Sequence, residues 1–208
     1  MYSNCKFSIW HTQTGIRDYY QAKADGSLYV NEWYSNSLQY YGEDGKAYIG
    51  LQTVDGKQYY FGSDGSVQRY CIVSENGKNY YCDGNGIAVE LQNNQWTKVG
   101  NDPYYYYVYV KDGKPLKNCV AEIDGIYYGF DSFGHMYRNT EFNFWDSEVS
   151  NQAYYWASVD GSLYTNRWGN NCYYGSDGKR CTGVQTIDGV QYGFNENGIA
   201  VQSGFVMT

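Results

Sequence analysis

Residues 54–67 read VDGKQYYFGSDGSV, a segment in which two glycine turns enclose a short run of aromatic side chains. The Asp55-Gly56 dipeptide favours a type I′ β-hairpin turn, because both central residues of that turn need a positive φ. Tyr59 and Phe61 follow the turn, and since side chains alternate along a strand, both point to the same face. The segment therefore predicts a small β-hairpin whose aromatic face forms the core.

Three further segments align with this one without a gap: ENGKNYYCDGNGIA at 75–88, IDGIYYGFDSFGHM at 123–136 and IDGVQYGFNENGIA at 187–200. Each opens on an Asn-Gly or Asp-Gly turn and closes on a second glycine. A lone hairpin is marginally stable in water, so hairpins of this kind are expected to stack and to bury their aromatic faces against one another. The residues three and five positions after the turn glycines, which we assign to the core, are Tyr59, Tyr80, Tyr128 and Tyr192, and Phe61, Cys82, Phe130 and Phe194.

A longer duplication is also present, because residues 7–33 align with residues 142–168 and share a Tyr-Tyr pair and the block DGSLY followed by N-x-W. After a short gap the match resumes at Tyr40-Tyr41 and Tyr173-Tyr174. A third N-x-W at residues 94–96 precedes the run PYYYYVYV and is interpreted as a diverged middle copy. The two ends of the chain are copies of one module.

The predicted fold class is all-β, an elongated solenoid of stacked β-hairpins, since no segment shows a sustained helical period with capping signals. We predict a single repeat domain over residues 1–208. Its parts are module 1 at about 7–68, an extra hairpin at about 69–90, module 2 at about 91–139 and module 3 at about 140–202. Residues 7–20 and their copy 142–155 are either a strand pair or a loop packed across the stack.

Composition excludes several classes of protein. Of 208 residues, 20% are aromatic, with 27 tyrosines, while 25 glycines and 2 prolines are too few for a disordered low-complexity chain. The formal charge of −7 disfavours nucleic acid, whose binding depends on Lys and Arg. The sequence contains no run of about 20 apolar residues, so it does not predict membrane insertion. The first residues lack the features of a signal peptide, so either the protein is cytosolic or the chain is a mature fragment.

The pattern of a DG turn, two or more aromatics and a second glycine resembles the cell-wall-binding and choline-binding repeats of Gram-positive surface proteins. It also resembles the glucan-binding repeats of extracellular glucansucrases and the receptor-binding repeats of large clostridial toxins, and GLQTVDGKQYYF at 50–61 looks most like these two. The resemblance covers most of residues 20–202. It implies a β-hairpin solenoid and noncatalytic attachment to a polysaccharide, a wall polymer or a host glycan.

The choline-binding branch holds quaternary ammonium in a box of aromatic rings by cation–π attraction. The resemblance places two tryptophans of that box at positions that this chain mostly substitutes, the first by Leu51, Ile72, Val120 and Val184 and the second by Gln58, Asn79, Tyr127 and Gln191. Only the N-x-W units keep a tryptophan in a comparable place, namely Trp33 and Trp168, and each of these is followed by a tyrosine pair, Tyr40-Tyr41 or Tyr173-Tyr174. Gln, Asn and Tyr at the substituted places suit a neutral sugar.

Flat apolar ring faces with polar tips favour sugar binding by tryptophan and tyrosine, and the alternative is that these rings only build the core. The predicted ligand-binding residues are Trp33, Tyr40, Tyr41, Tyr60, Trp96, Tyr127, Trp168, Tyr173 and Tyr174. Tyr104 to Tyr107 could likewise either contact a ligand or build the core.

Six cysteines suggest disulfides if the chain is extracellular, and Cys71–Cys82 and Cys172–Cys181 have suitable spacing. Alternatively, Cys82 packs as a buried thiol in the place of a phenylalanine. His11 and His135 are not kept between copies, and a Cys5–His11 pair lacks companions. We therefore predict no catalytic residues, no metal and no cofactor.

These observations predict a noncatalytic binding module, secreted or attached to the cell wall, whose partner is a polysaccharide or cell-wall glycan. Two alternatives stay open. One is a choline-binding module that anchors to choline-bearing teichoic acid, and the other is a repeat that adheres to a protein.

Overall fold

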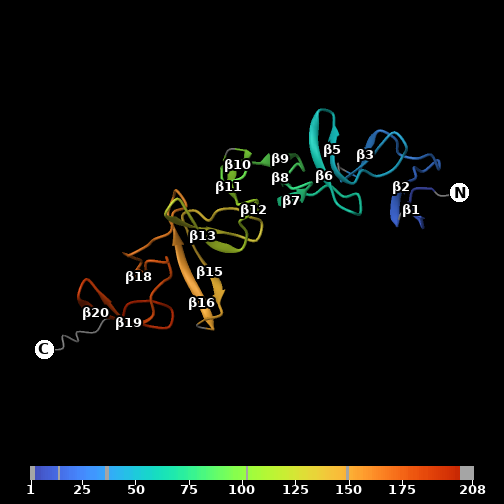
Figure 1. Ribbon diagram of the computed structural model, residues 1–208. Coiled ribbons are helices and arrows are strands. Elements are labelled where there is room, and N and C mark those ends of the chain that lie inside the picture. The colour runs from blue at the N-terminus through green and yellow to red at the C-terminus, as the bar shows by residue number, and fades with distance from the viewer. Residues whose placement is uncertain (1–2, 14, 36–37, 102, 149, 202–208) are drawn as a thin grey trace. The chain divides into compact units, whose positions relative to one another are not determined.

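The computed structural model describes residues 3–13, 15–35, 38–101, 103–148 and 150–201, and all regular elements in these ranges are β-strands (Figure 1). The predicted all-β class is confirmed. None of the described segments forms a helix that could cross a membrane. The chain divides into two compact units, Met1–Pro115 and Leu116–Thr208. The predicted single domain and its three modules stay a prediction.

The first unit contains three two-stranded hairpins and two three-stranded sheets. The hairpins are β1 (Lys6–His11) with β2 (Ile16–Gln21), β3 (Glu32–Tyr34) with β4 (Gln39–Tyr41), and β5 (Gly50–Val54) with β6 (Lys57–Phe61). The three-stranded sheets are β7 (Cys71–Glu75), β8 (Lys78–Cys82) and β9 (Ala88–Leu91), and β10 (Trp96–Asn101), β11 (Tyr104–Lys111) and β12 (Lys114–Pro115).

The second unit consists of four hairpins. They are β13 (Cys119–Ile123) with β14 (Ile126–Phe130), β15 (Thr140–Asp146) with β16 (Asn151–Ala157), β17 (Arg167–Gly169) with β18 (Cys172–Tyr174), and β19 (Gly183–Ile187) with β20 (Val190–Phe194). The described residues of the segments 7–20 and 142–155 therefore belong to strand pairs, which settles the alternative that the sequence left open.

The hairpin turns have the backbone that their dipeptides predict. Asp55 and Gly56 have φ values of 49° and 77°, as a type I′ turn requires. In the resulting register Gln52 lies opposite Tyr59 and Gly50 opposite Phe61. The other predicted turns, Asn76-Gly77, Asp124-Gly125 and Asp188-Gly189, also have positive φ at both residues.

A recurring backbone hydrogen bond connects successive hairpins within each unit. The N–H of Ala47, in the loop after β4, donates to the carbonyl oxygen of Tyr19 on β2 over 2.8 Å. Its counterpart in the second unit runs from Arg180 to Tyr154 over 2.9 Å. The same relation joins Val67 to Leu38, Leu163 to Tyr127, and Ala200 to Asn171. Each hairpin thus stacks on the one before it, and the two copies share the same connections.

The core is divided into small clusters, because each short hairpin has little apolar surface to bury. All four residues predicted at the fifth position after the turn glycine are buried, namely Phe61, Cys82, Phe130 and Phe194. At the third position only Tyr80 is buried, whereas Tyr59, Tyr128 and Tyr192 are half-buried. The prediction that both positions are core is therefore confirmed for the fifth position and for Tyr80. The three other tyrosines are only partly buried, and of these Tyr59 packs against the core cluster of Val54, Phe61 and Val67.

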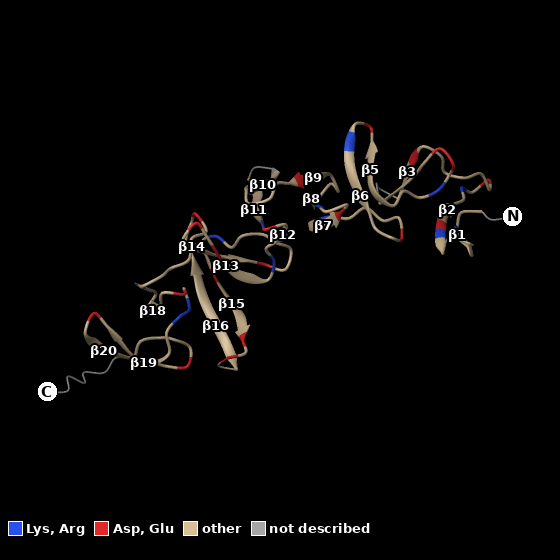
Figure 2. Cartoon of the chain, viewed as in Figure 1, with Lys and Arg blue, Asp and Glu red and all other residues tan. Residues whose placement is uncertain are grey.

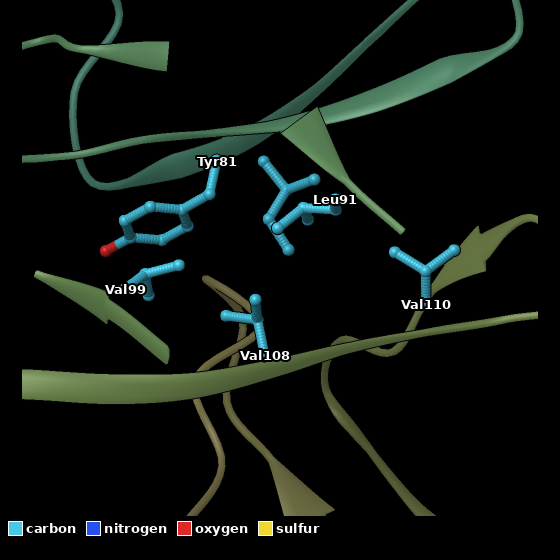
Figure 3. Close-up of a cluster of buried hydrophobic side chains, with 6 residues drawn as sticks. Tyr81, Leu91, Val99, Val108 and Val110 are labelled. Carbon is cyan, nitrogen blue, oxygen red and sulfur yellow. The ribbon is translucent and has the colours of Figure 1, made fainter. Parts of the chain in front are cut away.

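One aliphatic cluster lies between the sheet of β7, β8 and β9 and strands β10 and β11 (Figure 3). Tyr81 and Val108 are 1% and 0% exposed, respectively. The remaining members are Ile72, Leu91, Val99 and Val110. Buried side chains therefore connect these two sheets of the first unit.

Acidic residues lie mainly in turns and loops (Figure 2). Oδ1 of Asp64 accepts the backbone N–H of Ser66 at 2.9 Å, and Oδ1 of Asp131 accepts the N–H of Phe133 at 2.8 Å. Asp serves here to close turns, as its local hydrogen-bonding capacity favours.

The two cysteine pairs are held as thiols. Cys71 and Cys82 lie directly opposite each other in the β7–β8 register. The hydrogen bond with Cys71, together with burial, raises the pKa of the Cys82 thiol. Cys172 is buried and Cys181 half-buried, and burial raises the pKa of both.

Substitution of two glycines in the 75–88 hairpin distinguishes the cost of backbone strain from the cost of a packing overlap. Gly77 and Gly86 both have positive φ, but a Cβ at Gly77 would meet no atom within 4 Å, while one at Gly86 would overlap Cγ1 of Val67. We expect Gly77→Ala to lower the free energy of unfolding by about 1 kcal/mol. Gly86→Ala should cost about 3 kcal/mol or more. Urea denaturation followed by circular dichroism checks the difference, and equal losses would contradict the stacking of Gly86 on the preceding loop.

Candidate ligand-binding site

An aromatic cluster forms where the β3–β4 hairpin meets the next hairpin. Trp33 and Tyr40 are cross-strand partners, and their ring centroids lie 5.2 Å apart at an interplanar angle of 74°. Tyr59 on β6 approaches the same indole at 5.1 Å and 71°. Tyr48, from the intervening loop, lies 5.0 Å from Tyr40. Two phenol rings thus stand nearly perpendicular to the indole, a favourable edge-to-face geometry.

The second unit repeats this arrangement with almost the same geometry. Trp168 lies opposite Tyr173 in the β17–β18 register, at 5.4 Å and 67°. Tyr192 on β20 lies 4.9 Å from the indole at 68°. Cys181 stands where the first copy has Tyr48. We call the two sets the Trp33 cluster (Trp33, Tyr40, Tyr59) and the Trp168 cluster (Trp168, Tyr173, Tyr192).

Each cluster rests on a buried phenylalanine. Trp33 lies 6.0 Å from Phe61, and Trp168 lies 5.7 Å from Phe194. Trp168 nevertheless remains 40% exposed, and the five other rings of the two clusters are half-buried. One side of each cluster therefore belongs to the core, and its outer side is accessible to a ligand.

The structure divides the predicted site residues into three groups. Trp33, Tyr40, Trp168 and Tyr173 lie in the two clusters, and Trp96 keeps the same cross-strand pairing with Tyr109 at 5.0 Å. Tyr41 and Tyr174 are fully buried, because neighbouring strand residues point to opposite faces. Their rings are therefore not accessible to a ligand.

Tyr60 and Tyr127 lie elsewhere. Tyr60 packs against the buried cluster of Tyr80, Cys82 and Ala88, and Tyr127 packs against the cluster around Phe142. The structure does not bring either residue to the tryptophans.

Sequence reasoning missed Tyr59 and Tyr192, which it assigned to the core. Both occupy the third position after the turn glycine in a hairpin that directly follows an N-x-W unit. That combination occurs at equivalent places in both copies, and it is the sequence signal that could have identified them.

The phenol hydroxyls of the Trp33 cluster stay protonated at physiological pH. Burial raises the pKa of Tyr40 and Tyr59 above the ordinary value near 10. This cluster therefore offers neutral ring faces and phenolic hydroxyl groups. Such surfaces suit the C–H faces of a pyranose or an organic cation.

Each of the two histidines lies beside an aspartate. Nδ1 of His135, which is buried, lies 3.3 Å from Oδ2 of Asp131, and Nε2 of His11 lies 2.8 Å from Oδ2 of Asp18. Within the described ranges, no group of three or more His, Cys, Asp or Glu side chains could hold a metal ion.

Comparisons with known proteins agree with the repeat pattern. Residues 48–89 match the family model for the choline-binding repeat. Glucosyltransferase-S of Streptococcus mutans is 30% identical over 207 residues, which is 93% of this chain but 13% of that protein. Glucosyltransferase-I of Streptococcus downei is 29% identical over 177 residues, 83% of this chain and 10% of that protein. The resemblance to choline-binding and glucan-binding repeats is confirmed.

Among solved structures, the choline-binding domain of CbpL from Streptococcus pneumoniae is 26% identical to this chain. The comparison covers 95% of this chain and 98% of that domain, with a TM-score of 0.43.

The buried tyrosines predict a loss of stability at alkaline pH. Burial raises the pKa of Tyr41 to about 12. Above pH 10 the unfolded chain therefore loses phenolic protons that the folded chain retains, and the free energy of unfolding must fall as pH rises from 10 to 12. Other tyrosines with raised pKa values are Tyr20, Tyr40, Tyr59, Tyr60, Tyr128, Tyr137, Tyr155 and Tyr174.

Melting temperatures from pH 8 to pH 12, with phenolate absorbance recorded in parallel, test this expectation. Tyr41→Phe is the matched variant. It starts about 1 kcal/mol less stable, because Gln39 loses the 3.1 Å hydrogen bond from the Tyr41 hydroxyl, and its fall with pH is shallower. A melting temperature independent of pH up to 12 would contradict the burial of these rings.

Proposed function

We propose that this chain is a noncatalytic binding module that attaches to neutral polysaccharide or cell-wall glycan through the Trp33 and Trp168 clusters. The observation that carries the proposal is the repetition of one three-ring arrangement at equivalent places in two copies, with closely similar distances and angles. Flat ring faces pack against the apolar faces of pyranoses, and the phenol hydroxyls hydrogen-bond to the sugar's hydroxyl groups.

The presence of several sites on one chain explains how sites of low individual affinity can be sufficient for attachment to a polymer. A single ring platform gives a sugar affinity in the millimolar to micromolar range, roughly 4–8 kcal/mol of binding free energy. Several sites on one chain that engage one polymer raise the overall affinity, because later binding events are intramolecular. Trp96 with Tyr109 is a third candidate platform of this kind.

Choline is the second candidate ligand. The match of residues 48–89 to the choline-binding repeat favours it, and so do the nearly perpendicular rings, which resemble the walls of a cation–π box. The neutral glycan comes first because other residues replace the box tryptophans at most places, aliphatic residues at the first place and Gln, Asn or Tyr at the second, and because Cys181 removes one ring from the second copy.

We infer an extracellular location, secreted or attached to the cell wall, from the kind of surface and secreted proteins that the repeats resemble. The chain spans 13% of the length of glucosyltransferase-S, so a catalytic activity of such a relative is not transferred to it. The proposed role is attachment alone.

A retention assay tests the proposal. The intact chain is applied to immobilised α-glucans, purified cell wall and choline resin, beside a Trp33→Ala/Trp168→Ala variant. We expect the variant to lose at least about tenfold in apparent affinity for the glycan that retains the intact chain. Elution of the intact chain from cell wall by free choline would favour the second candidate.

The matched control is Trp10→Ala/Trp145→Ala, a second pair of equivalent tryptophans in the two copies, which are 54% and 63% exposed. Circular dichroism confirms that both double variants remain folded. Equal retention of all three proteins would exclude the two clusters as binding sites, and binding to a protein after deglycosylation would support the adhesion alternative.

A further inference from the structure

A cleft of about 450 Å³ opens in the first unit and is lined by three exposed tyrosines. Tyr70 is 54% exposed, Tyr104 is 82% exposed and Tyr106 is 40% exposed. None of these residues belongs to the tryptophan clusters. Large rings on a surface are normally isolated, so three around one cleft require an explanation.

Tyr70 has a backbone conformation that its residue type disfavours. Its φ is 50°, in the left-handed region where a bulky side chain is an outlier. Its N–H donates to the carbonyl oxygen of Asp83 over 3.4 Å, directly before strand β7 begins. The equivalent position before other hairpins also has positive φ and makes the corresponding hydrogen bond, and it is occupied by Asn4, Asn31, Asn118, Asn139 and Asn166.

Asparagine suits that position because it tolerates positive φ at low cost. Tyr70 therefore replaces a favourable residue with a strained one, and strain of this kind clusters at functional sites. The ring is accommodated because residue 84 is a glycine, and a Cβ there would overlap the phenol of Tyr70. The local sequence thus holds this ring at the cleft.

Alternation along β11 supplies the other two rings. In the run Tyr104 to Tyr107, the first and third residues are exposed, and the second and fourth are half-buried on the opposite face. Tyr105 and Tyr107 lie 5.6 Å apart, and Nζ of Lys98 lies 3.9 Å from the Tyr105 ring centroid. The tyrosine run is therefore divided between a packed face and a face that lines the cleft.

One wall of the cleft belongs to a buried hydrophobic cluster. Tyr81, which is 1% exposed, lines the cleft and packs in the cluster with Val99 and Val108 (Figure 3). A wall that is already packed lowers the ordering cost of binding.

The polar groups of the cleft suit a neutral ligand rich in hydroxyl groups. Asp83 and Asn85 line it beside the rings, and among the described residues that line it there is no Lys or Arg. Oδ1 of Asp83 already accepts the N–H groups of Asn85 and Ile87, at 2.8 and 2.9 Å. The Asn85 side chain, which is exposed, offers both a donor and an acceptor. This combination does not favour an anion.

We propose that the cleft formed by Tyr70, Tyr104, Tyr106, Asp83 and Asn85 is a separate binding site for a neutral oligosaccharide. The inference rests on the proposed attachment to polysaccharide and adds a site of a different construction, with tyrosines in place of a tryptophan. Pyranose faces pack on the three rings, and the Asn85 amide and the Asp83 carboxylate contact the hydroxyl groups.

The test is a titration of the intact, isotope-labelled chain with isomaltotriose, maltotriose, chitotriose and choline chloride, each to tens of millimolar, followed by nuclear magnetic resonance. Backbone amides of Asn85 and Gly100 report on the cleft, and the indole N–H signals of Trp33 and Trp168 report on the tryptophan clusters. We expect at least one of the oligosaccharides to shift the cleft amides in a saturable manner.

Tyr70→Asn is the decisive variant, because it installs the residue found at the equivalent positions. Its melting temperature should be equal to or higher than that of the unmodified chain, while the cleft affinity falls about tenfold. Tyr104→Ala should weaken binding similarly, and Phe133→Ala, which removes a ring that is 53% exposed in the second unit, should leave it unchanged.

The outcomes separate the two proposals. Shifts at the indoles without shifts at Asn85 and Gly100 would overturn the cleft and leave the proposed function standing. Shifts at the cleft alone would support the cleft and remove the tryptophan clusters from the binding role. No shift with any oligosaccharide, a cleft response to choline only, or unchanged cleft binding by Tyr70→Asn would overturn the inference.

Discussion

Each described hairpin depends on residues that adopt a positive φ. Asp55 and Gly56 close one hairpin in this conformation, and Asn31 and Asn166 introduce others. Without left-handed residues at Asp55 and Gly56 the strands β5 and β6 would not turn back within two residues, and the loop after them could not place Val67 to donate its hydrogen bond to the preceding hairpin. The high content of Gly, Asn and Asp is therefore a direct requirement of the fold, and it leaves strands too short for a large aliphatic core.

Aromatic side chains compensate for those short strands. A tyrosine or tryptophan covers far more area than an aliphatic residue and can reach from one hairpin to the next, as Trp33 does to Tyr59 and Trp168 does to Tyr192. A ring that bridges two small hairpins cannot be covered on every side, so part of it stays accessible. In this architecture the residues that hold the stack together also present the surfaces that we propose bind glycan, and stability and binding are coupled in the same side chains.

The sequence predicted the elements better than the site. Turn dipeptides and alternation located the hairpins, the copies and the buried residues Phe61 and Phe194, because these depend on local backbone preference. Alternation also states that Tyr40 and Tyr41 point to opposite faces, but it does not state which face meets the next hairpin, and so both were assigned to the site. The roles of Tyr59 and Tyr70 depend on contacts and hydrogen bonds between segments distant in sequence, which no local pattern reveals.

The central claim is that the two tryptophan clusters are glycan sites, and a crystal structure of the chain soaked with an isomaltooligosaccharide at tens of millimolar tests it most directly. The account predicts pyranose density stacked on Trp33 and Trp168, with hydroxyl groups within hydrogen-bond distance of the surrounding phenols. Fully occupied sugar elsewhere on the molecule, with both clusters closed and free of density, would contradict it.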